Sequence, residues 1–169
     1  ANILTRTMII FGQGAIRCHP YAYQEVAALE NDDVNGFDKA FFAHVGHVVR
    51  NTSRSVLLYL TRGPLVPVSG SKELVRYYRY LSWCSASYAL LADVTMGTLG
   101  GKLKFKESLT GKLADILSWM YLISATLRKY EADGQNPKHA PYVHYLCQLG
   151  FVNIQDSFES IYGNLPIPG

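Results

Sequence analysis

The chain has 169 residues, a length that can bury one hydrophobic core, and hydrophobic residues make up 49% of it. Its net charge of +3 is small and spread along the sequence, which argues against a nucleic-acid-binding protein. Charged residues account for 17%, so we expect some of the apolar surface to be covered by the rest of a larger protein.

The three cysteines, Cys18, Cys84 and Cys147, are far apart and show no CxxC spacing. This argues against a zinc or dithiol motif and fits a reducing cytoplasm. The most apolar stretch, residues 56–60, is bounded by arginines on both sides. No run therefore approaches the roughly 20 apolar residues of a membrane-spanning helix, and any membrane contact should be peripheral.

Hydrophobic residues recur with a period of about 3.6 almost throughout, which predicts an all-α chain. A short helix over residues 3–11 should end at Gly12-Gln13-Gly14, and Pro20 can start a second helix that runs to about Leu29. After a turn at residues 31–33, a long helix should reach Gly63-Pro64. Its predicted inner stripe consists of Phe37, Phe41, Val45 and Val48.

Three more long helices follow the loop that ends at Gly70. Ser71 can cap the first of them, which should fade near Gly97, and the next should end at Gly134. Pro137 leads into the last helix, which should stop at Gly163. The predicted inner stripes are Leu74, Tyr77, Tyr78, Leu81, Tyr88 and Leu91, then Leu113, Ile116, Leu117, Met120, Leu127 and Tyr130, then Tyr142, Leu146, Leu149, Ile154, Phe158 and Ile161.

Four long helices joined by short connections are most simply packed as an antiparallel up-and-down bundle. We therefore expect an all-α fold of this kind, with the short N-terminal helix pair docked beside it or against another part of the protein.

Two histidines, His44 and His47, are three residues apart on a predicted helix and close to Asp38 in sequence. A metal site in a bundle usually also needs carboxylates on facing helices, and none is evident, so we interpret the pair as packing or surface residues. The pair His139 and His144 makes no stronger case. We expect no metal site.

Two other motifs near the N-terminus have simpler interpretations than catalysis. Gly12-Gln13-Gly14 lacks the Lys-Ser/Thr of a phosphate loop and is interpreted as a hinge. Cys18 and His19 are adjacent, so their side chains should diverge, and no catalytic cysteine is expected.

Basic residues gather in two places, Arg50, Arg54 and Arg62 on one helix face and Lys102, Lys104 and Lys106 after a glycine pair. Either group could contact acidic lipid headgroups or ligand phosphates, but a solvated or partner-facing surface is the simpler interpretation. The run Tyr77, Tyr78 and Tyr80, flanked by Arg76 and Arg79, has the composition of an interface hot spot.

Five segments carry a resemblance to a known family: ANILTR (1–6), IFGQGAIRCHP (10–20), NGFDKA (35–40), RYYR (76–79) and LGG (99–101). Together they are similar to the C-terminal helical region of long bacterial-type FAD-dependent acyl-CoA dehydrogenases of fatty-acid β-oxidation. The resemblance implies oxidation of acyl-CoA to trans-2-enoyl-CoA, in which a glutamate removes the α-proton and a hydride passes to the flavin. It also implies that this glutamate lies just upstream of Ala1, so no catalytic residue is expected here.

The resemblance further implies a division at residue 19, with residues 1–19 as the end of the flavin core and a hinge, and residues 20–169 as a C-terminal helical bundle domain. Ala1, Asn2 and Ile3 should lie nearest the FAD. Ala1 replaces a threonine common in short-chain relatives, so only backbone contact is implied there.

The isolated chain should therefore be inactive and should have a structural, docking or oligomerising role in the full-length enzyme. Its expected partners are its own flavin-binding core, acyl-CoA through the full-length protein, further copies of itself and the inner membrane face as a peripheral contact; the expected compartment is the cytoplasm. The alternative is an autonomous helical interaction or peripheral-membrane module without flavin chemistry.

Overall fold

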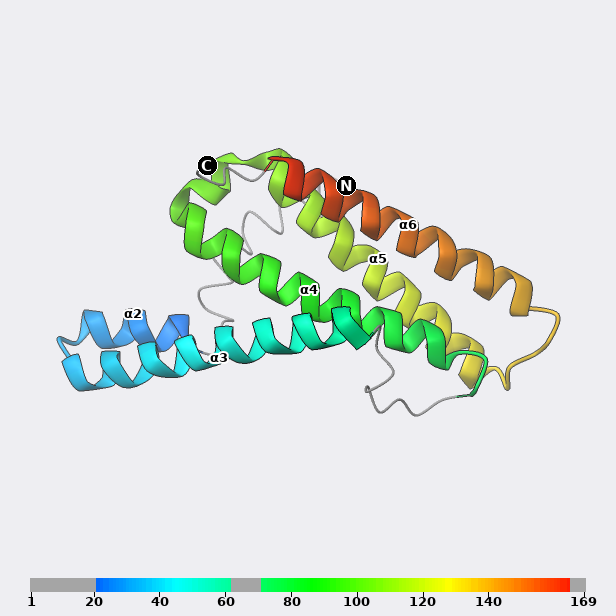
Figure 1. Cartoon of the computed structure of the whole chain (residues 1–169), viewed down its shortest axis with the longest axis horizontal. Helices are drawn as coiled ribbons and strands as arrows, with labels where there is room; N and C mark the ends of the chain where they lie inside the picture. Colours follow the sequence, from blue (N-terminus) through cyan, green and yellow to red (C-terminus); the bar gives the residue numbers. More distant parts are fainter. Residues whose placement is uncertain (1–20, 62–70, 165–169) are drawn as a thin grey trace.

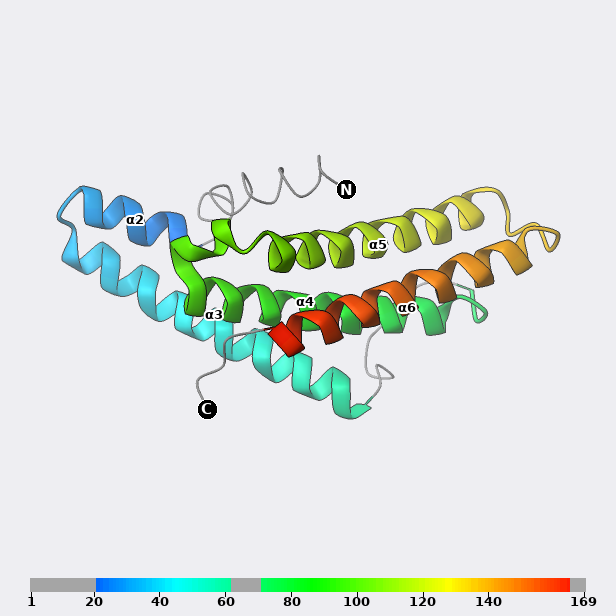
Figure 2. The same ribbon diagram turned by 90° about the horizontal axis from the view of Figure 1, so that it is seen from above.

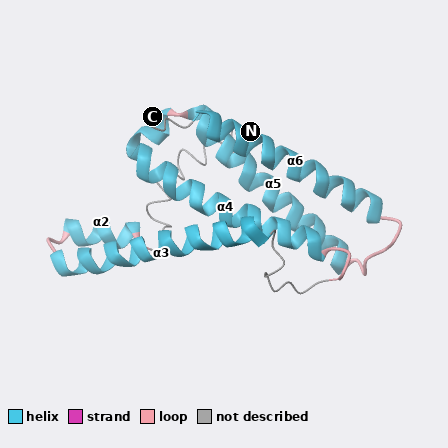
Figure 3. Ribbon diagram, viewed as in Figure 1, coloured by secondary structure: helices cyan, strands magenta, loops and turns pink. Residues whose placement is uncertain are grey.

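The computed structural model describes residues 21–61 and 71–164. In these ranges every regular element is helical and no strand occurs, which confirms the all-α prediction (Figure 3). The elements are α2 (Ala22–Glu30), α3 (Val34–Thr61), α4 (Val75–Leu99), the 3-10 helix η1 (Gly100–Phe105), α5 (Glu107–Ala132) and α6 (Ala140–Asn164). The helix expected over residues 3–11 lies outside the described ranges.

The helices α5 and α6 form an antiparallel hairpin with the most extensive helix–helix contact of the described chain. Their buried residues recur at alternating steps of three and four, the spacing that keeps one seam facing a partner helix. On α5 the seam comprises Leu109, Leu113, Ile116, Met120, Ile123, Leu127 and Tyr130, and on α6 Val143, Cys147, Gly150, Ile154, Ser157 and Ile161.

The other helices add to this hairpin in chain order. The helix α4 packs against α5, α3 against α4 and α2 against α3, which confirms an up-and-down arrangement. In Figures 1 and 2, α2 and the first half of α3 extend past the end of the α4–α6 bundle as an arm. Within this arm, the nine-residue helix α2 packs against the first half of α3.

Several local predictions need correction. Ser71 does not cap α4 with its hydroxyl; its carbonyl oxygen accepts hydrogen bonds from the N–H groups of Leu74 and Val75, and α4 begins at Val75. The end of α5 is close to its predicted place, because Gly134 adopts a φ of 72° that favours glycine.

The predicted inner stripe of α3 is wrong in part. Phe41 and Val45 are each 45% exposed, whereas Ala40, Ser55 and Leu58 are buried. The reason is that α3 carries two apolar faces, and the one turned toward α2 and α4 is the less bulky. On α5 and α6, three predicted core residues are also exposed, namely Leu117, Tyr142 and Leu146.

Candidate functional site

The largest exposed apolar feature on α3 is a continuous face along its length. It is formed by seven exposed apolar side chains and one threonine, which fall within an arc of about 100° at the α-helical repeat. We call this the apolar face of α3: Phe41, Phe42, Val45, Val49, Thr52, Val56, Tyr59 and Leu60. Between residues 41 and 60 no charged residue falls on this arc. Of these eight residues, only Phe41 and Val45 belong to the inner stripe that the sequence predicts for this helix.

Beside the second half of this face lies a groove of about 730 Å³ between α3, α4 and α6. We call it the aromatic groove; its ring-bearing residues are Tyr59, Tyr80, Trp83, Phe151, Phe158 and Tyr162. Tyr80 makes edge contacts with Trp83 on its own helix at 5.1 Å and with Phe151 at 4.8 Å between ring centroids, and the second contact joins α4 to α6. The groove forms because α3 packs against α4 but makes few contacts with α6.

The polar residues of the aromatic groove determine what it can hold. Gln155 and Glu159 lie along it, and its lining residues include no lysine or arginine. A dinucleotide such as FAD carries a pyrophosphate that needs cations or backbone N–H groups. The groove therefore does not fit FAD, but it fits an apolar side chain or helix.

The predicted tyrosine–arginine hot spot is mostly structural. Tyr77 is buried, and its hydroxyl lies 2.8 Å from Nδ1 of His144 and accepts a hydrogen bond from Arg76 at 2.6 Å. The contact between Tyr77 and His144 joins α4 to α6. Of the three tyrosines, Tyr80 is the one that is exposed, and it lines the aromatic groove.

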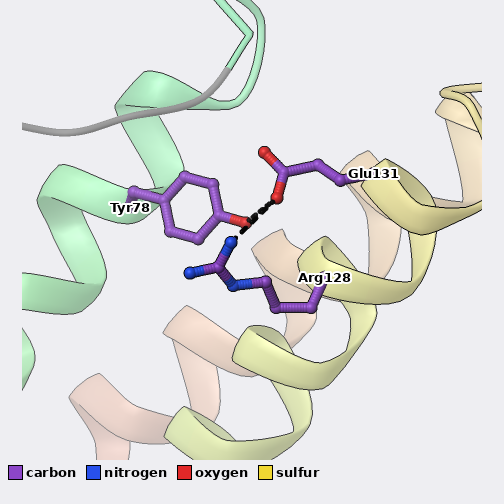
Figure 4. A network of polar contacts seen from close by, with 3 residues as sticks. All are labelled: Tyr78, Arg128 and Glu131. Atoms are coloured by element: carbon purple, nitrogen blue, oxygen red, sulfur yellow. Dashed lines mark hydrogen bonds and ion pairs between the residues drawn. The ribbon is translucent and has the colours of Figure 1, made fainter.

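A second polar network joins α4 to α5 (Figure 4). The hydroxyl of Tyr78 donates a hydrogen bond of 2.8 Å to Glu131, and Arg128 forms a 3.5 Å ion pair with the same carboxylate. Burial, followed by the hydrogen bond to Glu131, raises the pKa of Tyr78 to about 12. The Tyr78 hydroxyl therefore stays protonated and is a structural donor.

The histidines of α3 hold the arm together. Nδ1 of His44 lies 2.8 Å from Oε1 of Glu25 on α2. His47 contacts Asn51 at 2.9 Å, and Asn51 donates a hydrogen bond of 3.3 Å to Asp93 on α4. Within residues 21–61 and 71–164, no three His, Cys, Asp or Glu side chains gather in a way that could hold a metal ion.

The predicted basic clusters remain apart from one another. Arg50 and Arg54 are exposed on the side of α3 away from its apolar face, and Lys102 and Lys106 are exposed near η1. The described residues do not include Arg62 or the side chain of Lys104. In the described part of the chain, no helix is both long enough and apolar enough to cross a membrane.

The buried thiols of Cys84 and Cys147 are expected to be unreactive. Burial raises the pKa of Cys84 to about 12 and that of Cys147 to about 11, so both remain thiols near neutral pH. The expected cofactor contacts Ala1, Asn2 and Ile3 lie outside the described residues, as do the hinge Gly12-Gln13-Gly14 and the Cys18-His19 pair. These expectations stay predictions, and so does the division at residue 19.

Comparison with known proteins identifies the family. No solved structure matches the chain. The family model described as "Acyl-CoA dehydrogenase, C-terminal, bacterial type" matches residues 16–169, which is most of the chain. The match includes every described helix, from the arm to the α5–α6 hairpin. The chain therefore belongs to the family of bacterial-type acyl-CoA dehydrogenase C-terminal domains.

Proposed function

We propose that the chain is the non-catalytic C-terminal domain of an FAD-dependent acyl-CoA dehydrogenase that oxidises fatty acyl-CoA to trans-2-enoyl-CoA. The observation that carries this proposal is the family match over residues 16–169. The flavin supplies the acceptor for the hydride, and the catalytic base belongs to the core that precedes this domain in the enzyme. The domain itself acts in the cytoplasm by supporting that core.

The roles of three carboxylates, Glu25, Glu131 and Asp133, are consistent with a non-catalytic domain. Glu131 accepts a hydrogen bond from Tyr78, Glu25 pairs with His44, and Asp133 forms a 2.7 Å ion pair with Lys129. Each of these acids is engaged in holding helices or helix ends, whereas a base for α-proton removal must face a bound thioester. The aromatic groove, with Glu159 and no cation among its lining residues, also lacks a partner for coenzyme A phosphates.

The exposed apolar side chains support a domain that packs against other protein. Beyond the apolar face of α3, large side chains are exposed on the outer sides of the α5–α6 hairpin, including Leu122, Tyr142 and Val152. Surfaces of this kind usually mark contacts with other protein when they form contiguous patches. We assign the outer side of the hairpin to contact with the flavin-binding core.

The test compares the full-length enzyme with a version that lacks residues 20–169. We expect the shortened protein to lose bound flavin, measured by absorbance, and therefore acyl-CoA-dependent flavin bleaching. A full-length variant with the upstream base replaced by glutamine is the matched control, because it should keep its flavin and lose only the bleaching. A shortened protein that stays flavin-loaded and fully active would contradict the proposal.

One observation favours the second candidate, a peripheral-membrane module. Arg50 and Arg54 lie on the side of α3 away from its apolar face, a pattern typical of helices that lie in a membrane interface. In that case the chain should sediment with anionic vesicles at low salt and should release when salt is raised, because the basic contacts are screened.

A further inference from the structure

We propose that α3 pairs antiparallel with α3 of a second copy of the chain through its apolar face, about a two-fold axis midway between residues 50 and 51. The proposal concerns self-association of this domain. It holds or fails separately from the assignment of the domain to the dehydrogenase.

The first argument is the symmetry of the apolar face. In an antiparallel pair centred between residues 50 and 51, each residue faces the partner residue whose number brings the sum to 101. Each of the eight positions then faces another member of the same set: Phe41 with Leu60, Phe42 with Tyr59, Val45 with Val56, and Val49 with Thr52. An isologous contact requires such a self-complementary surface, since each patch meets its own copy. The remaining exposed leucine of this helix, Leu57, lies on the flank of the face.

The second argument is size. The face spans 20 residues, or about 30 Å of helix, and its seven apolar side chains are between 45% and 72% exposed. Together they expose roughly 700 Å², close to the area of about 800 Å² per partner in a standard stable interface. Thr52 does not disturb this surface, because its hydroxyl already donates to the carbonyl oxygen of Val48 at 2.8 Å.

The third argument is shape. The first half of α3 belongs to the arm (Figure 1), and in the second half of the face Val56 and Tyr59 line the aromatic groove. Antiparallel pairing therefore brings the arm of one copy, with its protruding Phe42, to the mouth of the partner's groove near Tyr59. The two-fold axis repeats this contact at the other end of the pair, so each arm contacts the groove of the other copy.

Charge is compatible with the pairing. Arg50 and Arg54, the two arginines within the paired stretch, lie on the other side of α3. Two copies can approach along their apolar faces without bringing these arginines together. Salt should therefore change the dimerisation constant little, in contrast to binding to an anionic membrane.

The main experiment exploits the pairing of Val45 with Val56. Val45→Glu and Val56→Lys should each give monomers in sedimentation velocity, because each buries an unpaired charge at the interface. Mixed in equal amounts, the two variants should form a heterodimer, since the new carboxylate meets the new ammonium across the pair. Val45→Glu mixed with Val49→Lys is the matched control and should stay monomeric, because these positions do not face each other. Arg50→Glu, on the opposite side, should leave the wild-type dimer intact.

A second experiment avoids charges in case the charged variants fold poorly. In a background with Cys18 replaced by serine, an equal mixture of Val45→Cys and Val56→Cys should form a disulfide-linked heterodimer on mild oxidation. Val45→Cys alone should not, because its two copies would lie about 16 Å apart along the paired helices.

Two outcomes would overturn the pairing. One is a wild-type chain that stays monomeric at its highest soluble concentration, whether or not it then binds vesicles. The other is a dimer that persists in both charged variants and shows no preference for the mixed disulfide. Flavin content of the full-length enzyme tests the proposed function and is not a readout here, so either proposal can fail alone.

Discussion

At Gly150 the side chains of α5 pack close against the backbone of α6, and its replacement by alanine gives a sharp test of the packing. A Cβ atom placed there would lie 2.7 Å from Cγ1 and 2.8 Å from Cδ1 of Ile123, and 3.3 Å from Cε3 of Trp119. Cγ1 of Ile123 is held close to the backbone of α5, and Ile123 is 2% exposed, so the side chain has little room to move.

Two opposing effects determine the size of the change. Overpacking a well-filled core costs about 1–3 kcal/mol, whereas alanine in place of glycine inside a helix gains about 1 kcal/mol. We therefore expect Gly150→Ala to lower the free energy of unfolding by about 1 kcal/mol. For a chain of this size, that corresponds to a fall in Tm of about 2–4 °C.

The assay is urea unfolding of the 169-residue chain, followed by far-UV circular dichroism. Gly46→Ala on α3 is the matched control, because its new Cβ meets nothing within 4 Å and should stabilise the chain by about 0.5–1 kcal/mol. In an Ile123→Ala background, Gly150→Ala should become neutral or stabilising, since the clashing atoms are gone. If Gly150→Ala stabilises the chain as much as the control does, the close packing of this seam is refuted.

Three further predictions concern buried polar groups. Iodoacetamide at pH 8 should leave Cys84 and Cys147 unmodified in the folded chain, because their raised pKa values leave almost no thiolate. Both cysteines should be labelled in urea, which peptide mass spectrometry would show. Rapid labelling without urea would contradict this. The free energy of unfolding should fall as pH rises from 9 toward 12, because the unfolded chain releases the Cys84 proton near pH 9 while the folded chain holds it to about pH 12. Cys84→Ala should reduce that loss of stability by about 1 kcal/mol between pH 8 and 10. If the variant loses as much stability over this pH range as the wild type does, the prediction is wrong. Tyr78→Phe should cost about 1 kcal/mol of stability, measured by urea unfolding, because Glu131 loses its donor; Tyr121→Phe, at an exposed site, is the control and should have no effect.

The sequence was most informative where one apolar face dominates a helix. On α4 and α5 the predicted stripes contain Leu74, Leu91, Ile116 and Leu127, all of which are buried. The end of α5 followed from Gly134, whose left-handed φ explains the glycine there. In these helices, hydrophobic periodicity and the glycines at helix ends predicted the same core residues and boundaries, so the two signals together were sufficient.

Helix α6 shows where periodicity alone is insufficient. Tyr142 and Leu146 were expected inside, yet the seam runs one residue later, through Val143 and Cys147. Both pairs have the same spacing, so periodicity does not distinguish between them. The deciding factor is the close approach around Gly150, which requires small residues on the inner side and depends on the partner helix.

The candidate site was harder to predict than the fold. A sequence does not tell which apolar face of a helix has a neighbour, and the predicted core stripe of α3 shares only Phe41 and Val45 with the apolar face that is exposed. The aromatic groove draws on the consecutive helices α3 and α4 and on the distant helix α6, so no local pattern could reveal it. Of the ring-bearing residues that line it, Phe158 was predicted in the core and Tyr80 at an interface, and neither prediction joins them in one groove.

The order in which the helices pack has a consequence for folding and local opening. Among the described helices, the extensive contacts join each helix to its neighbour in the chain. Contacts of such short sequence separation close small loops, so the chain should fold quickly for its length. They also make opening stepwise: the arm formed by α2 and the first half of α3 can detach while the α5–α6 hairpin keeps its seam. Amide hydrogens should therefore exchange fastest in the arm and slowest around Ile123 and Ile154, a gradient that runs from one end of the chain to the other.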